Sequence, residues 1–68
     1  MAAKSIRLDD VSSTVTYVGE APVGASPTSP IWRISRITLS GTETIIQYAG
    51  GSTAWNSIWE DRASLTYI

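Results

Sequence analysis

Alternating apolar and polar residues predict several β-strands in this chain. Between residues 13 and 18, Val15 and Tyr17 alternate with threonines, which is typical of a strand with one buried face. Residues 6–8 indicate a shorter strand before it. Leu65 and Tyr67 share one face of a final strand expected over residues 63–68. The pattern predicts a mainly β protein.

The strongest pattern lies between residues 31 and 49, where two apolar runs flank a turn sequence. The first run covers residues 31–39 and the second covers residues 43–49. Gly41 lies between them and readily adopts the positive φ that a tight hairpin turn needs. We therefore predict an antiparallel hairpin over residues 31–49, at the centre of the fold.

The first strand of this hairpin changes the face on which its apolar residues lie. Trp32 and Ile34 share one face, whereas Ile37 and Leu39 have the opposite parity. A β-bulge near residues 35–36 would produce this change, and so would a strand that is covered on both faces. The sequence leaves both alternatives open.

Two further segments interrupt the strand pattern. Residues 19–30 contain three prolines and two glycines, and we predict a long Pro/Gly-rich loop there because proline lacks the N–H that an internal strand needs. Trp55, Ile58, Trp59 and Arg62 recur at helical spacing, which predicts at most one short helix near residues 53–61.

Taken together, these patterns predict a single β-rich domain over residues 1–68. The expected fold is a small antiparallel sheet, or a partly open barrel or sandwich, built around the central hairpin. The expected core side chains are Val15, Tyr17, Trp32, Ile34, Ile37, Ile46, Tyr48 and Leu65.

The length of the chain makes a partner attractive as a source of stability. A domain of 68 residues buries only about 60% of its unfolded surface, so its core is thin. Small domains are usually stabilised by disulfides, by a metal or by association. The chain has no Cys and no His, which removes disulfides and the usual zinc or copper ligands. We therefore expect no cofactor and no metal, and completion of the core by other chains.

Charge and hydropathy argue against two other classes of partner. The five basic residues are scattered and the net charge is −1, so no basic patch is expected to follow a phosphate backbone. No segment reaches the roughly 20 apolar residues of a membrane span. We expect neither nucleic acid nor membrane as a partner, and a cytoplasmic location after synthesis.

Catalytic motifs are equally scarce. Without His, no Ser-His-Asp or Cys-His arrangement can form, and Lys4 is the one lysine for a Ser-Lys pair. The acidic neighbours Asp9-Asp10 and Glu60-Asp61 fit a turn and a solvated face better than a pair of catalytic carboxylates. We expect no enzymatic activity and no small-molecule substrate.

The three tryptophans allow three interpretations. They could fill the core in the absence of Phe, form an interface, or provide a stacking platform for a sugar or another ligand. Trp59 is the best interface candidate because Arg62 follows closely and could stack on an aromatic ring or bind a carboxylate. The full set of expected interface residues is Trp59, Arg62, Pro22, Pro27, Trp55, Arg33 and Arg36.

Several sequence runs resemble small virion proteins and fibre-type segments of tailed bacteriophages. These runs are Tyr17-Val18-Gly19-Glu20-Ala21-Pro22-Val23-Gly24, Ile31-Trp32-Arg33-Ile34-Ser35-Arg36-Ile37, Tyr48-Ala49-Gly50-Gly51 and Trp59-Glu60-Asp61-Arg62-Ala63-Ser64-Leu65-Thr66-Tyr67. The resemblance covers residues 17–67 and contains no catalytic signature. It implies a non-enzymatic component of the phage particle, either associated with the tail and its fibres or decorating the capsid.

The partners that this resemblance implies are other virion proteins and further copies of the chain. Its expected location is the host cytoplasm during assembly and the virion afterwards. An alternative is a small carbohydrate- or protein-binding module that uses exposed Trp residues.

Overall fold

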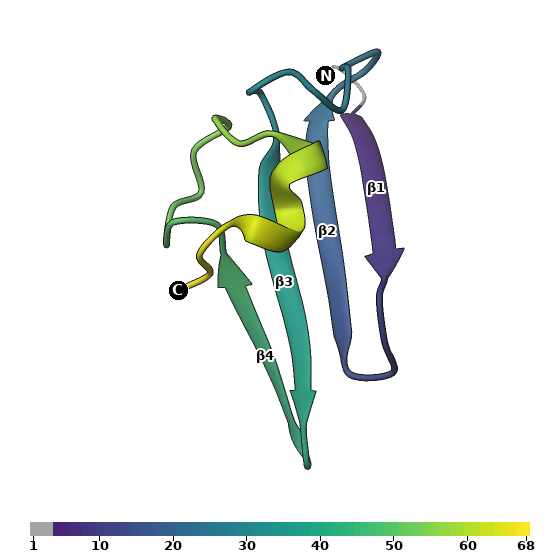
Figure 1. The fold of residues 1–68 in the computed structure, drawn as a ribbon, viewed down its shortest axis with the longest axis vertical. Helices are drawn as coiled ribbons and strands as arrows, with labels where there is room; N and C mark the ends of the chain where they lie inside the picture. The colour runs from purple at the N-terminus through teal and green to yellow at the C-terminus, as the bar shows by residue number, and fades with distance from the viewer. Residues whose placement is uncertain (1–3) are drawn as a thin grey trace.

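The computed structural model describes residues 4–68 and shows one antiparallel sheet of four strands in the order β1-β2-β3-β4 (Figure 1). The strands are β1 (Lys4–Asp10), β2 (Val15–Pro22), β3 (Arg33–Ser40) and β4 (Glu43–Tyr48). A single turn-like 3-10 helix, η1 (Trp59–Ser64), lies in front of the sheet. The mainly β class is therefore confirmed, and the sheet is open rather than closed into a barrel.

The central hairpin is confirmed, with β3 and β4 paired from Ser35↔Tyr48 to Ser40↔Glu43. The predicted loop over residues 19–30 begins too early, because β2 continues to Pro22. Proline is tolerated there because the pairing of β2 with β3 ends at Glu20↔Arg33, before Pro22 needs a ladder N–H. The loop therefore begins at Val23.

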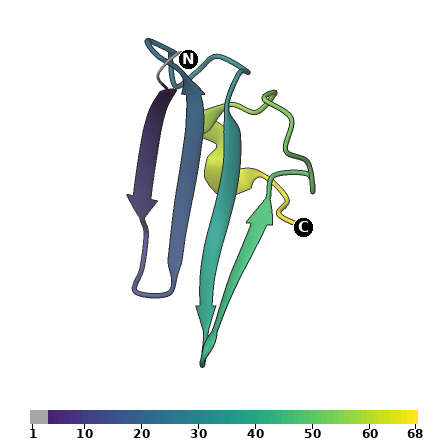
Figure 2. The ribbon, with the colours of Figure 1, turned by 180° about the vertical axis from the view of Figure 1, so that it is seen from behind.

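The change of parity in β3 is not caused by a bulge. The register of β3 with β4 advances one residue at a time, and so does its register with β2. Trp32 and Ile34 lie on the face that the C-terminal segment covers, whereas Ile37 and Leu39 lie on the opposite face. Both predicted explanations are wrong, because no described element covers that opposite face (Figure 2).

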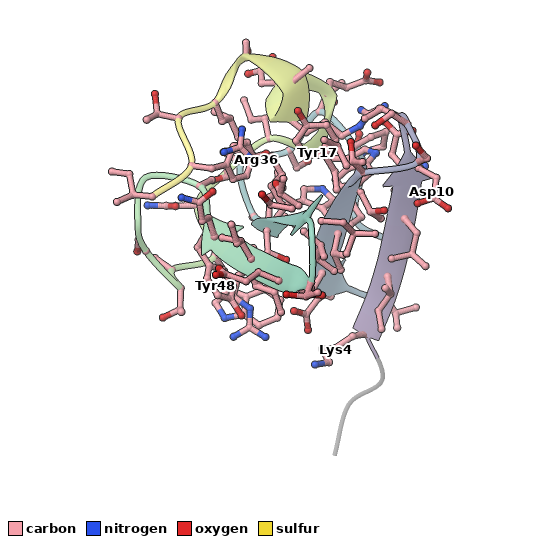
Figure 3. The ribbon with its side chains drawn as sticks, turned by 90° about the horizontal axis from the view of Figure 1, so that it is seen from below. Lys4, Asp10, Tyr17, Arg36 and Tyr48 are labelled. Carbon is pink, nitrogen blue, oxygen red and sulfur yellow. The ribbon has the colours of Figure 1, made fainter. Side chains whose placement is uncertain are left out.

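We call the two sides of the sheet the covered face and the open face. The covered face carries Tyr17, Gly19, Ala21, Ile34 and Arg36 under residues 57–68. Figure 3 shows Tyr17 and Arg36 between the sheet and this segment, with Tyr48 and Lys4 on the other side. The apolar side chains of the open face are Ile6, Leu8, Val18, Ile37, Leu39, Ile46 and Tyr48.

Most of the core lies between the covered face and the C-terminal segment. Its buried hydrophobic residues are Ala21, Trp32, Ile34, Ala49, Trp59 and Tyr67, with Tyr17, Ala25 and Leu65 packed against them. Of the predicted core residues, Trp32 and Ile34 are fully buried. Val15, Tyr17, Ile37, Tyr48 and Leu65 are only half-buried. The prediction is wrong for Ile37, Ile46 and Tyr48, because their positions in β3 and β4 direct them to the open face.

Gly19 is the point at which the C-terminal segment approaches the sheet most closely. A Cβ at Gly19 would clash with the Trp59 ring and would lie 3.1 Å from Cε3 of Trp32. The two indole rings meet above this glycine, with their centroids 5.8 Å apart. A residue without a side chain is therefore needed for Trp59 to lie on β2.

Polar contacts fix the C-terminal segment on both sides of the contact between Trp59 and Gly19. Arg62 Nε donates to Asp9 of β1 at 2.9 Å, and the Tyr67 hydroxyl donates to the Arg62 carbonyl at 2.7 Å. Burial raises the pKa of Tyr67 to about 12, so this hydroxyl stays protonated as a donor near neutral pH. The segment thus bridges from the first strand to the last.

The predicted secondary structure of the C-terminal segment is only partly right. The helix is shifted from residues 53–61 to Trp59–Ser64, because the covering contacts of Trp59 set its start. The final strand expected over residues 63–68 is reduced to one antiparallel bridge, Ala49↔Tyr67. The Pro/Gly-rich loop is fixed to the core by a hydrogen bond, because Trp32 Nε1 donates to the Ser26 carbonyl at 2.9 Å.

Gly19→Ala is expected to lower the free energy of unfolding by about 1–3 kcal/mol, because the added methyl group overpacks the contact with Trp59. Alanine would otherwise stabilise slightly by restricting the unfolded chain. Urea denaturation followed by circular dichroism measures the effect. The loss should shrink in a Trp59→Leu background, and an equal loss in both backgrounds would show that Trp59 is not the cause.

Trp32→Ala is expected to cost about 3–5 kcal/mol, because it empties the centre of the core. Trp55→Ala provides a matched control, since Trp55 is 41% exposed and should cost far less. Both free energies are measured by denaturation followed by circular dichroism. Equal losses for the two variants would contradict the core assigned here.

Candidate protein-binding surface

The open face gathers apolar side chains from all four strands of the sheet. The register places Leu8 directly opposite Val18. It also places Ile37 opposite Ile46, and Tyr48 opposite the small side chain of Ser35. Because cross-strand neighbours are about 5 Å apart, these residues form one continuous apolar patch.

This patch is exposed to an extent that is unusual for large aliphatic residues. Ile6 is 60% exposed, Leu8 70%, Leu39 47% and Ile46 58%. Four strands about 4.8 Å apart and about 20 Å long give a face of roughly 400 Å² in projection. This area is an upper bound for the apolar patch, because Lys4, Asp10, Glu20 and Arg33 share the face. Exposed apolar patches of a few hundred Å² commonly mark sites of interaction.

The charged residues at one end of the open face are paired within the chain. Glu20 contacts Lys4 Nζ at 2.9 Å and Arg33 at 3.0 Å. The hydrogen bond from Lys4 is the main cause that lowers the pKa of Glu20, and Arg33 lowers it further. This carboxylate therefore remains ionised near neutral pH, and the three charges largely satisfy one another.

Three of the predicted interface residues belong to the covered side. Trp59 is 5% exposed and is a core residue, which corrects its assignment as the best interface candidate. Arg62 lies 4.6 Å from the centroid of the Trp59 ring and is paired with Asp9. Arg36 lies over Tyr67. The expected Arg-on-aromatic contacts exist, but these arginines use them to hold the C-terminal segment on the sheet.

The remaining predicted interface residues do not form one surface. Pro22 is exposed at the end of β2, whereas Pro27 is half-buried and its carbonyl accepts a hydrogen bond from Glu60. Arg33 does meet Trp55, with the guanidinium 4.5 Å from the ring centroid. Trp55 is the one exposed tryptophan, so the predicted Trp-based binding module has a single ring whose one face Arg33 occupies.

The apolar residues of the open face were not predicted as an interface, although Arg33, which lies at one end of this face, was. The available signal was the opposite parity of Ile37 and Leu39, which places apolar side chains on both faces of one strand. Ile6 and Leu8 of β1 add apolar side chains to the same face. Apolar residues of both parities within one strand, together with apolar residues of matching parity in its neighbours, are the pattern that indicates this surface.

Other types of site are not found in the part of the chain that the structure describes. Residues 4–68 contain no pocket and no group of three or more acidic residues placed to hold a metal ion. No helix among them is long and apolar enough to cross a bilayer.

The ion pairs of Glu20 predict a pH dependence of stability. The pKa of Glu20 is lowered below the usual 4.5, so its contribution is present above that pH and is lost as the pH falls through the folded-state pKa. We expect Glu20→Gln to cost about 1 kcal/mol at pH 7, reduced by partial solvent screening. The difference from the wild-type protein should narrow as the pH is lowered below 4.5 in urea denaturation. A difference independent of pH would contradict this role.

Comparison with known proteins identifies no relative for this arrangement: no family model, no curated protein and no solved structure matches the chain.

Proposed function

We propose that this chain is a non-enzymatic structural subunit of a tailed-phage virion, and that it docks onto other virion proteins through the open face. The observation that carries the docking role is the exposed apolar patch on the bare side of the sheet. The virion assignment rests on the sequence resemblance to small phage particle proteins, which covers residues 17–67.

The energetic argument for docking begins with the exposed aliphatic residues. Burying a Leu or Ile side chain completely contributes about 1.5–3 kcal/mol. Ile6, Leu8 and Ile46 each leave more than half of their surface in water. Covering them therefore gains several kcal/mol, which offsets part of the entropy lost when two molecules associate.

The charges of this face indicate what kind of surface fits it. Lys4, Glu20 and Arg33 already pair with one another, so a partner need not supply opposite charges at that end. At the other end of β1, Asp10 accepts a hydrogen bond from Thr16, and the apolar patch lies between these ends of the sheet. The surface that matches it is an apolar sheet or helix packed about 10 Å above the strands.

Mass spectrometry of washed particles tests the virion assignment, with the chain expected at a fixed copy number. Its absence from particles made while it is expressed would refute the assignment. A copy number in the hundreds would favour capsid decoration, whereas a small multiple of three, five, six or twelve would favour the tail or neck.

Ile46→Lys tests the open face directly. A lysine at this position would be buried without a partner on docking, so incorporation into particles should fall by about tenfold or more. Val23→Lys is the matched control, because Val23 is 66% exposed but lies in the loop after β2. Circular dichroism of both variants confirms that the fold is retained. Equal incorporation of the two variants would exclude the open face as the docking surface.

A further inference from the structure

The outer edge of β1 is unpaired in the described chain. β1 is the first strand of the sheet, and its one strand partner is β2 (Figure 1). The other outer strand is different, because the chain after it returns to form the Ala49↔Tyr67 bridge, and Ile68 N–H donates to the Tyr48 carbonyl. One edge of the sheet is therefore partly covered and the other is open.

The backbone groups on this edge can be assigned by following the ladder across the sheet. Leu39 N–H donates to the Thr14 carbonyl, so the odd residues of β3 direct their backbone groups toward β2. Alternation then makes the odd residues of β2 face β1, and the odd residues of β1 face β2. Lys4, Ile6, Leu8 and Asp10 consequently direct their N–H and C=O groups outward.

The side chains of these four outward residues are complementary to a second copy of the same strand. In an antiparallel pair centred on Arg7, Lys4 of each copy lies opposite Asp10 of the other. Ile6 of each copy then lies opposite Leu8 of the other. Figure 3 shows Lys4 and Asp10 at opposite ends of β1, as this pairing requires. Opposite charges and apolar pairs in these positions both stabilise a ladder. Lys4 also contacts Glu20 and Asp10 accepts a hydrogen bond from Thr16 within the chain, so the cross-strand charge pairs add to these contacts.

Neighbouring registers lose this complementarity. A shift of two residues places Lys4 opposite Leu8, or Asp10 opposite Ile6, and removes both Lys4–Asp10 pairs. The second of these shifts also places Arg7 opposite Asp9, but Asp9 is already paired with Arg62 in its own chain. A shift of one residue puts outward-facing backbone groups opposite inward-facing ones, so the hydrogen bonds cannot form. The centred register is also the one that pairs all seven residues of β1.

One pair in the centred register is unfavourable. Arg7 lies opposite its own copy, and like charges directly opposite destabilise a ladder. The guanidinium of Arg7 is, however, drawn over the ring of Trp32, at 5.8 Å from its centroid. This contact directs the charge across β2 toward the centre of the sheet and away from the shared edge.

We propose that two copies of this chain associate through antiparallel pairing of β1 with β1, in the register that places Lys4 opposite Asp10. The product is a continuous sheet with twofold symmetry, in which the two open faces lie side by side. Their combined projection of roughly 800 Å² reaches the area that one partner contributes to a standard protein interface.

Charge reversal tests the register in the purified, full-length chain. Sedimentation velocity from about 1 µM to about 1 mM is expected to show a monomer–dimer equilibrium. Asp10→Lys should weaken the dimer about tenfold or more, because it places two lysines opposite each other at both ends of the pair. The double variant Lys4→Glu/Asp10→Lys should restore most of the affinity, since each pair is then reversed in sign. Both variants are compared in a Glu20→Gln background, because the carboxylate introduced by Lys4→Glu would otherwise repel Glu20.

Two controls separate this effect from a change in net charge or fold. Glu60→Lys makes the same change of charge on η1 and should leave the dimer intact. Ile6→Pro removes an outward N–H without removing a bond to β2, so it should abolish the dimer while circular dichroism shows a retained sheet. A chain that stays monomeric throughout, or a double variant as weak as Asp10→Lys, would overturn the proposal. Either result would leave the proposal of docking through the open face unaffected. That proposal is tested at Ile46 on β4, whereas the dimer is tested at the edge of β1.

Discussion

The contact of Trp59 with Gly19 is the interaction on which the rest of the fold depends. It is the place where the C-terminal segment reaches the backbone of the sheet, and it brings the Trp59 ring against Trp32. Arg62 and Tyr67 then extend the cover toward β1 and β4 through their contacts with Asp9 and Ala49. Because most of the core lies under this segment, loss of the contact would expose apolar residues of the covered face as well as those of the open face.

A cover of this size can protect only one face of a four-stranded sheet. Residues 57–68 lie over the face that carries Ile34 and Ala21, and the described chain has no further segment for the other. The exposure of the open face therefore follows from strands that carry apolar residues of both parities under a segment that covers one side of them. β1 also has a free edge, because no further described strand pairs with its outer side.

The local elements could be predicted from sequence better than their packing. Alternation and turn residues were sufficient for the central hairpin, because its pairing depends on neighbours in the chain. The role of Trp59 could not be read in this way, since it depends on a glycine 40 positions away that has no distinctive local pattern. Ile46 was misplaced for a related reason: alternation shows that two faces differ, but it does not show which face the chain will cover.

The position of the cover after the sheet in the chain has a consequence for synthesis. All four strands leave the ribosome before Trp59, Arg62 and Tyr67, which supply the contacts over their buried face. The emerging sheet thus has apolar residues exposed on both sides until the last of these contacts forms, a state that favours aggregation or capture by chaperones. The hairpins can pair as they are made, but the core is complete only when Tyr67 has reached the covered face.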